Sequence, residues 1–239
     1  MKVINDIVGY QNLKIVQDTQ MFNFSLDSVL LARFVTINKK IKRILDIGCG
    51  NAPIPIILST RTSANIVGIE IQKDVYQLAQ ESISINNLDT QIDLVNGDIN
   101  DIYKKIESDS FDVITCNPPY FKATPTANYN KNDYKTIARH ELRLNIEQIL
   151  KISKKLLKNN GVLGLVHRPD RLIEIIEFMR LYNIEPKKIR FVYPKKQDCA
   201  NMILIEGKKN GKPGLTILPP LYVHKDDGSY TEEVKYFFE

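Results

Sequence analysis

The sequence predicts an α/β protein with a mostly parallel, seven-stranded sheet, helices on both faces and an antiparallel C-terminal hairpin. Three observations lead to this prediction. From about residue 42 onward, short apolar runs alternate with segments of helical periodicity. Several of these runs are apolar on both faces, as in the buried strands of a parallel sheet. In the last third of the chain, two strand-like runs follow each other after a short connection, which is typical of a hairpin.

The expected elements follow one another along the chain. Strands are expected at seven apolar runs: residues 43–48, 65–70, 91–98, 111–116, 161–167, 187–194 and 200–209. Helices are expected to begin at Asn51 and to span three further segments: residues 73–85, 146–157 and 171–181. Asn145 and Gln148 have the spacing of a capping box, and Asn159-Asn160-Gly161 is expected to end that helix.

The first 36 residues differ from the rest of the chain. Residues 3–17 have the pattern of a small hairpin around Gly9-Tyr10, and residues 21–34 that of a turn entering a helix. No internal repeat, low-complexity segment or flexible linker interrupts the sequence. We therefore expect a single domain over residues 1–239, with an N-terminal extension (1–36) and a core (37–239).

The composition is that of a soluble globular protein. Hydrophobic residues make up 43% and charged residues 26% of the 239 positions, and no apolar run is long enough to span a membrane. No signal peptide is recognised, so a cytoplasmic location is expected. The net charge of +5 favours a polyanionic partner without deciding the function. Neither a disulfide framework nor a metal site is expected, because the cysteines and histidines occur singly: Cys49, Cys116, Cys199, His140, His167 and His224.

Polar or glycine-rich residues follow each of the first four core strands. In an open α/β sheet, ligands bind at the carboxyl ends of the strands, near the point where the strand order reverses. Four such strand ends together predict a ligand site more strongly than any one of them. The expected ligand-binding residues are Asp46, Gly48, Cys49, Gly50, Glu70, Ile71, Asp98, Ile99 and Asn117.

Two cofactors are candidates for binding at the glycine-rich turn. A nicotinamide dinucleotide would use a third glycine, but the sequence has Ala52-Pro53 there, and Asp46 would bring negative charge near the pyrophosphate. Acidic residues better suit the sulfonium and amino groups of S-adenosylmethionine. Glu70 would then hold the ribose hydroxyls, and Asp98 the adenine amino group.

These residues, in this order, resemble the amino-methylating branch of the class I S-adenosylmethionine-dependent methyltransferases. The resemblance rests on Asp46-Ile-Gly-Cys-Gly50, Glu70, Gly97-Asp98 and Asn117-Pro118-Pro119-Tyr120. It implies a Rossmann-like fold and S-adenosylmethionine as the methyl donor. It also implies that the Asn117 side-chain oxygen and the Pro118 carbonyl accept hydrogen bonds from a planar amino group, on which Tyr120 stacks. The expected catalytic residues are Asn117, Pro118, Pro119 and Tyr120.

Such a corner has a physical rationale. The lone pair of an aromatic amine is delocalised into its ring, so the amine is a poor nucleophile. Two acceptors that hold its hydrogens aim the lone pair at the methyl group and stabilise the positive charge that develops on nitrogen. Consecutive prolines make the corner stiff, which limits reorganisation during the reaction.

The flanking segments resemble the bacterial tRNA(Val) adenine-N6 methyltransferases. This resemblance implies that tRNA is the partner and that adenine 37, beside the anticodon, is the target. One departure is Ala52-Pro53, where a glycine is common in the family. The individual roles of the flanking residues are left open, and they comprise Phe22–Leu31, Ala138-Arg139-His140-Glu141, Pro213–Leu221 and Asp227–Glu233.

Two groups of basic residues are candidates for contact with RNA. One is a helix face for which a solvated surface is the favoured interpretation: Lys151, Lys154, Lys155 and Lys158. The other surrounds the hairpin, and there contact with RNA is slightly favoured: Lys187, Lys188, Arg190, Lys195 and Lys196.

Two alternative functions remain open at this point. Glutamine-N5 methyltransferases of release factors carry the same Asn-Pro-Pro-Tyr motif, but after a larger helical N-terminal domain than the roughly 40 residues available here. A non-catalytic RNA-binding protein on this fold would be expected to lose Asn117 or the acidic residues, and the sequence keeps them. The oligomeric state is not indicated.

Overall fold

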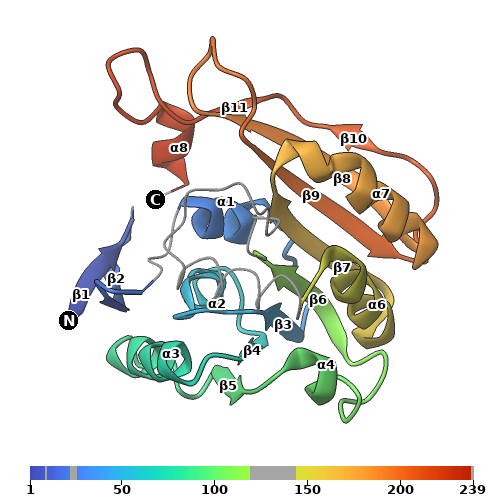
Figure 1. The fold of residues 1–239 in the computed structure, drawn as a ribbon, viewed down its shortest axis with the longest axis horizontal. Coiled ribbons are helices and arrows are strands. Elements are labelled where there is room, and N and C mark those ends of the chain that lie inside the picture. Colours follow the sequence, from blue (N-terminus) through green and yellow to red (C-terminus); the bar gives the residue numbers. More distant parts are fainter. Residues whose placement is uncertain (9, 22–25, 119–143, 238–239) are drawn as a thin grey trace, which may run out of the picture.

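A nine-stranded sheet forms the centre of the part of the chain that the computed structural model describes, which is residues 1–8, 10–21, 26–118 and 144–237 (Figure 1). Seven strands make its body in the order β5-β4-β3-β6-β7-β9-β8, and the short β10 and β11 both pair with β8. The strands are β3 (Arg43–Ile47), β4 (Asn65–Glu70), β5 (Ile92–Asn96), β6 (Phe111–Cys116), β7 (Leu157–His167), β8 (Ile184–Tyr193), β9 (Met202–Lys209), β10 (Thr216–Ile217) and β11 (Leu221–Tyr222).

The direction of the strands agrees with the sequence prediction. Strand β9 runs antiparallel to both β7 and β8, and the other pairs between described strands of this sheet are parallel. The predicted seven-stranded body with an antiparallel hairpin is therefore confirmed. The two additional strands contain only two residues each, a length at which apolar alternation gives no usable signal.

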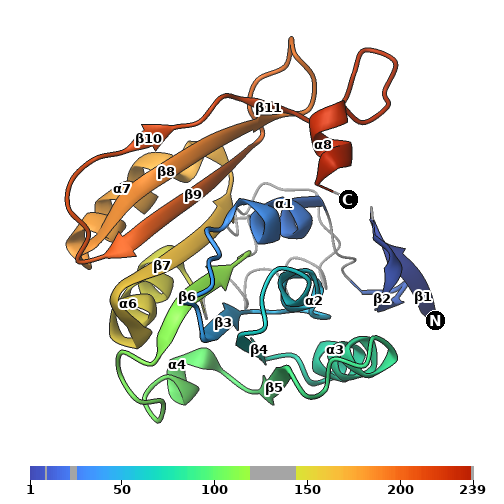
Figure 2. The ribbon, with the colours of Figure 1, turned by 180° about the vertical axis from the view of Figure 1, so that it is seen from behind.

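Helices cover both faces of the sheet, as predicted (Figures 1 and 2). One face packs against α1 (Leu26–Phe34), α2 (Pro53–Ser59) and α3 (Lys73–Ile85). The other packs against α4 (Ile99–Ile102), α6 (Ile146–Leu156) and α7 (Leu172–Leu181), which follows the short η1 (Pro169–Arg171). Neighbouring strand residues such as Ile44 and Leu45 belong to opposite cores, because successive side chains alternate across a strand. This double coverage explains why the strands are apolar almost throughout.

The end of α6 differs from the prediction. Its capping box is present, since Asn145 and Gln148 exchange side-chain and backbone hydrogen bonds. However, the helix ends at Leu156, and β7 begins at once with the fully buried Leu157. Residues 159–161 lie inside β7, where Asn160 has a φ of 63° beside a register shift in the pairing with β6. The expectation that these residues end the helix was wrong, because the same left-handed preference also suits a bulge.

The N-terminal extension begins with a separate two-stranded sheet. Strands β1 (Lys2–Ile7) and β2 (Tyr10–Asp18) form the predicted antiparallel hairpin. Side chains on α3 and at its C-cap fasten the hairpin to the core. The backbone of Lys14 exchanges hydrogen bonds of 2.9 and 2.7 Å with the C-cap residue Asn86, and Val16 N donates to Ser82 Oγ at 2.9 Å. The hairpin therefore packs as part of the face that carries α1, α2 and α3.

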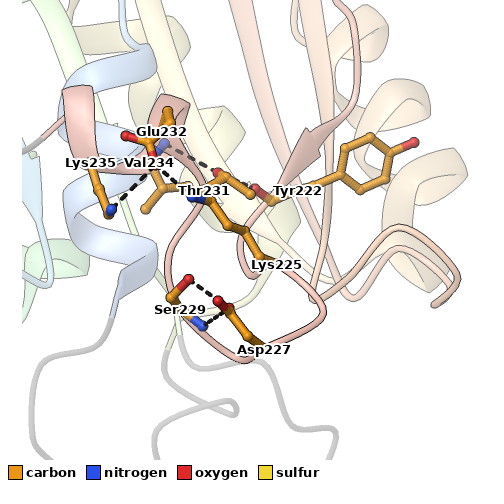
Figure 3. Close-up of polar contacts among 8 residues, drawn as sticks. All are labelled: Tyr222, Lys225, Asp227, Ser229, Thr231, Glu232, Val234 and Lys235. Carbon is orange, nitrogen blue, oxygen red and sulfur yellow. Dashed lines mark hydrogen bonds and ion pairs between the residues drawn. The ribbon is translucent and has the colours of Figure 1, made fainter.

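The C-terminal tail is more ordered than the polar segment expected from the sequence. Figure 3 shows a turn in which Asp227 accepts hydrogen bonds from the backbone and hydroxyl of Ser229. Thr231 donates to the carbonyl of Tyr222 at 2.7 Å and caps α8 (Glu232–Tyr236), which is anchored by the buried Val234. Among the described residues, none of the helices has the length and apolar character needed to cross a bilayer.

Candidate active site

The candidate site lies where the strand order reverses. From β3 the chain adds β4 and β5 on one side and then β6 and β7 on the other, so β3 and β6 are neighbours at the switch point. Ile47 and Cys116, the last residues of these strands, are paired in register. The glycine-rich turn after β3 and Asn117 after β6 therefore begin side by side, as predicted.

The turn after β3 is a cradle made of backbone. Gly48 and Gly50 have φ angles of 69° and 57°, in the left-handed region that glycine adopts without strain. The amides of Gly48 and Cys49 both donate to the carbonyl of Ile69, at 2.9 and 3.0 Å, which fixes the turn to the end of β4. A Cβ atom added at Gly48 or Gly50 would meet no atom of the described residues within 4 Å. With respect to these residues the outer side of the turn is open, which suits close approach of the backbone to a ligand.

Ala52 takes the same unusual conformation without being a glycine. Its φ of 71° and ψ of 33° are left-handed, it is fully buried, and Pro53 follows as the first residue of α2. A left-handed alanine costs about 1 kcal/mol relative to glycine. The departure at Ala52-Pro53 therefore keeps the turn and stores a small strain in it.

Asp46 is buried beneath this turn. It is 1% exposed, and its Oδ1 accepts a hydrogen bond of 2.6 Å from the hydroxyl of Thr115 on β6. Burial raises the pKa of Asp46 to about 7; the Thr115 hydrogen bond acts in the opposite direction, and the Glu70 carboxylate raises the pKa further. The folded protein thus has a carboxyl group that a nearby cation would help to ionise.

Glu70 joins the ends of β3 and β4. Its two carboxylate oxygens accept hydrogen bonds from backbone amides, Oε2 from Gly50 at 3.0 Å and Oε1 from Gln72 at 2.8 Å. Glu70 itself is buried, at 5% exposed. Its carboxylate therefore supports the turn after β3 from the end of β4.

Asp98 follows β5 at the same edge of the sheet. Gly97 N donates to the carbonyl of Glu70 at 3.0 Å, which places Asp98 next to the end of β4. Asp98 Oδ1 accepts hydrogen bonds from the backbone and side-chain amides of Asn100, at 2.8 and 3.0 Å, and thereby caps α4. Helix α4 is too short to have been recognised from the sequence.

The remaining predicted residues of the cofactor site contribute to apolar packing. The Cys49 side chain is buried against β4, where a Cβ at Gly68 would come within 2.9 Å of its sulfur. Burial raises the pKa of the Cys49 and Cys116 thiols well above the usual value, and the Asp46 charge adds to this effect. Ile71 is half-buried, and Ile99 is buried in the core of the face opposite α1.

Asn117 directly follows β6 and forms a hydrogen bond with a residue of α1. Its Nδ2 donates to the hydroxyl of Ser28 on α1 at 3.2 Å. Pro118 is buried next to it. Pro119 and Tyr120 lie outside the described residues, as do Arg139, His140 and Glu141.

The geometry therefore brings a backbone cradle, two buried acids and an amide to one edge of the sheet.

A profile described as "Methyltransferase domain" matches residues 38–209, which is more than half of the chain. The chain belongs to the methyltransferase domain family. The tRNA1(Val) (adenine(37)-N6)-methyltransferase of Flavobacterium psychrophilum is 24% identical over 94% of this chain and 94% of its own length. The protein of the same name from Cytophaga hutchinsonii is 26% identical over 83% of this chain and 86% of its own.

A solved structure agrees on the fold of this methyltransferase. The crystal structure of a predicted O-methyltransferase from Agrobacterium tumefaciens matches with a TM-score of 0.71 and 19% identity, covering 89% of this chain and 95% of that one. The Rossmann-like methyltransferase fold predicted from the sequence is therefore confirmed.

Members of both groups of basic residues in this methyltransferase make internal contacts. Lys154 and Lys155 donate to Asn210 and to the carbonyl of Tyr103, while Lys158 belongs to β7 and pairs with Asp112 at 2.7 Å. The predicted single helix face therefore does not exist beyond Lys155. These lysines lie near the end of α6 and the start of β7, at the edge of the sheet opposite the cradle.

The hairpin cations of this methyltransferase are similarly engaged. Lys188 pairs with Glu206 at 3.1 Å, and Arg190 donates to the carbonyl of Pro219 at 3.0 Å. Lys187 and Lys195 each donate to a backbone carbonyl. These contacts give Lys187, Lys188, Arg190 and Lys195 a structural role that the clustering in sequence did not indicate. Among the described residues, no group of three or more metal-ligating side chains could hold a metal ion.

Several site residues of this methyltransferase were not identified from the sequence. Thr115 interrupts a buried apolar strand, which was an available signal for a hydrogen-bonded partner. Asn51 Nδ2 donates to the carbonyl of Val16 at 2.9 Å and so ties the cradle to the N-terminal hairpin. The contact between Ser28 and Asn117 joins residues 89 positions apart, so no local pattern could have revealed it.

Proposed function

We propose that this protein methylates the N6 amino group of adenine 37 in tRNA(Val). Membership of the methyltransferase family supplies the reaction class, and the names of the similar proteins supply the substrate. The observation that carries the proposal is the juxtaposition of the glycine cradle after β3 and Asn117 after β6, at the ends of two paired strands. A methyl donor on the cradle would lie beside an amide suited to hold an amino group.

S-adenosylmethionine is the methyl donor, and when bound it supplies an electrophilic methyl group on a sulfonium. The open side of Gly48 and Gly50 fits a ligand that lies against the backbone. We propose that the Glu70 carboxylate accepts the ribose hydroxyls, and that the Asp98 carboxylate accepts the adenine amino group of the donor. Asp46, buried under the cradle, contributes negative charge that favours a cationic ligand.

The amino group of the substrate is assigned to the corner after β6. The Asn117 side-chain oxygen and the Pro118 carbonyl would accept its two hydrogens, which directs the nitrogen lone pair away from them and toward the donor. The same acceptors stabilise the positive charge that develops on nitrogen. Tyr120 is proposed to stack on the base, a mode of binding that suits an adenine turned out of a single-stranded loop.

The N-terminal extension packs with the core as one unit. Its described residues form the β1–β2 hairpin and α1, and all three pack on the face that carries α2 and α3. We therefore propose that residues 1–239 act as a single domain. Because the proposed substrate is found in the cytoplasm, we propose that the protein acts there.

Transfer of radiolabelled methyl groups tests the proposal. The purified protein is incubated with labelled S-adenosylmethionine and, in separate reactions, with total tRNA or with a purified release factor. Label in tRNA alone is expected, and the Asn117→Ala variant should transfer none above background. Label in the release factor would favour the glutamine alternative. Tight binding of the donor without transfer to either acceptor would refute the enzymatic proposal.

A further inference from the structure

The N-terminal hairpin is fastened to the core along the outer edge of β2. Lys14 and Val16, which are two residues apart, direct their backbone N–H and C=O groups away from β1. Three side chains of the core bind these groups, and they belong to Asn86, Ser82 and Asn51. Asn86 and Ser82 belong to α3 and its C-cap, whereas Asn51 lies in the glycine turn after β3. The hairpin therefore contacts the proposed donor site as well as a helix.

The contact between Asn51 and Val16 is buried. Asn51 Nδ2 donates to the Val16 carbonyl at 2.9 Å, and the two residues are 6% and 3% exposed. A buried carbonyl that loses its donor is poorly placed to bind water instead, so breaking this bond is unfavourable. The Val16 N–H is held at the same time by Ser82 Oγ, at 2.9 Å. Val16 thus connects the glycine turn to α3.

Contacts must select the backbone conformation of this turn. Gly48, Gly50 and Ala52 have φ angles of 69°, 57° and 71°. Glycine adopts this left-handed region without strain but adopts many other conformations as easily, and alanine adopts it only at a cost. Such a conformation persists where surrounding groups hold it in place. The order of the turn therefore depends on its neighbours.

Two separate elements support the turn. The end of β4 binds the amides of residues 48–50, through the Ile69 carbonyl and the Glu70 carboxylate. Asn51 comes next, and its side chain is bound by the hairpin. Pro53 then begins α2. The hairpin therefore holds the turn just before the chain enters the helix, at a point beyond the contacts with β4.

We propose that Asn51 is a positioning residue for the methyl donor, because its bond to Val16 lets the docked hairpin hold the glycine turn in the conformation that binds the donor. The inference rests on the proposed donor site at this turn. A turn that is already held loses less conformational entropy when the donor binds, so the affinity is higher. Because coupling between two sites is reciprocal, a donor bound on the turn also stabilises the docked hairpin.

Calorimetric titration with S-adenosylmethionine tests the first half of the proposal. Asn51→Ala in the full chain should raise the Kd for this donor by about three- to tenfold, as expected for the loss of one hydrogen bond. The kcat at saturating donor and tRNA should stay within about twofold of the wild type, because the variant acts before the chemical step. An unchanged Kd, or a kcat that falls as much as the affinity, would overturn the proposal.

Asn86→Ala is the matched control for a loosened hairpin. It removes the two hydrogen bonds between Asn86 and the backbone of Lys14 without touching the glycine turn. The donor Kd of this variant should stay within about twofold of the wild type, because Val16 remains bound to Asn51. An equal rise of the Kd in both variants would mean that any loosening of the hairpin weakens binding, and it would overturn the role of Asn51.

Hydrogen exchange followed by mass spectrometry tests the reciprocal effect. Saturating S-adenosylmethionine should slow exchange in the β2 segment of the wild type and of Asn86→Ala by about three- to tenfold, the same factor as the change in Kd. It should have little effect on that segment in Asn51→Ala. Equal protection in all three proteins, or none in the wild type, would overturn the inference. If the wild type shows the protection but does not methylate tRNA, the inference holds and the proposed function fails.

Discussion

The glycine turn after β3 and the corner after β6 end neighbouring strands of one sheet, yet they are supported differently. The turn is held mainly by the end of β4, through the Ile69 carbonyl and the Glu70 carboxylate, about 20 residues along the chain. The corner is held through Ser28, which lies 89 positions before Asn117. The glycine turn of the proposed cofactor half is thus held mainly by contacts about 20 residues away, although Asn51 also bonds to Val16 in the N-terminal hairpin. The proposed amine-binding half is held by a contact with α1 in the N-terminal extension.

This difference predicts two classes of mutational effect, one on the affinity for the methyl donor and one on turnover. Changes in the turn should act mainly on affinity for the methyl donor, because the turn forms the surface on which the donor is proposed to lie. Changes at the corner should act mainly on turnover, because its acceptors are proposed to act on the amine during the reaction. Variants that mix the two effects would argue against the division.

The largest effect is expected at Asn117. Asn117→Ala removes the proposed acceptor and should lower kcat by at least about 100-fold. In other enzymes, removing one group that stabilises developing charge in the transition state has an effect of this size. The Kd for the methyl donor, measured by isothermal titration calorimetry, should stay within about twofold of the wild type. A comparable loss of both quantities would show that Asn117 belongs to the cofactor half.

Asp46 should make donor binding depend on pH. With a pKa of about 7 in the free protein, its ionised fraction rises about tenfold between pH 6 and pH 8, so donor affinity should rise by up to that factor. The dependence should largely disappear in Asp46→Asn, which should also bind the donor more weakly at pH 8. Calorimetry at both pH values measures this, and equal slopes in wild type and variant would contradict the role of Asp46.

The same pKa has a consequence for stability. Its rise from 3.8 in the unfolded chain to about 7 means that the folded protein keeps a proton that the unfolded chain releases between these values. The contribution of Asp46 to the free energy of unfolding is therefore largest below pH 4 and is lost as the pH rises to 7. Urea unfolding of the free protein should show a smaller decline over this range for Asp46→Asn.

Two glycine substitutions separate the cradle from the packing beneath it. The Cβ of Gly50→Ala would enter the open side of the turn, so donor affinity should fall on the order of tenfold, with a stability cost of about 1 kcal/mol. The Cβ of Gly68→Ala would lie 2.8 Å from Leu94 Cδ2 and 2.9 Å from Cys49 Sγ, so stability should fall by about 1–3 kcal/mol. Chemical unfolding and donor titration of both variants check this, and reversed effects would contradict the assignment.

The smallest effect is expected at Ala52. Ala52→Gly relieves about 1 kcal/mol of left-handed strain but removes a buried methyl group worth about 0.8 kcal/mol, so stability should change by less than about 1 kcal/mol. Ala79→Gly, at an equally buried position in α3, loses the methyl group and the helical preference and should cost about 1–2 kcal/mol. Equal costs in thermal or urea unfolding would show that Ala52 is unstrained.

Much of the core could be predicted because its signals are local. The buried parallel strands are continuous apolar runs, and α3 begins and ends where its periodicity does, at Lys73 and Ile85. The acids and glycines of the proposed cofactor half lie at the ends of β3, β4 and β5 or directly after them, so a rule about strand ends predicted where they gather. That Glu70 contacts the glycine turn following Asp46 was therefore predictable.

The parts that were not predicted depend on contacts distant in sequence or on very short elements. The left-handed preference of residues 159–161 suited two structures, and the pairing of Leu157 with Phe111 on β6 decides for a strand. Helix α4 has four residues, and the tail is ordered by its pairing with β8. The hairpin cations look available in sequence, but Glu206 reaches Lys188 only in the folded sheet.

Mass spectrometry of a nucleoside digest tests the central claim most directly. Transcribed tRNA(Val) is incubated with the protein and S-adenosylmethionine, in parallel with a transcript in which guanosine replaces adenine 37. The account predicts N6-methyladenosine in the first digest and none in the second, with Asn117→Ala inactive on both. A methyl group on another nucleoside, or N6-methyladenosine in both transcripts, would contradict it.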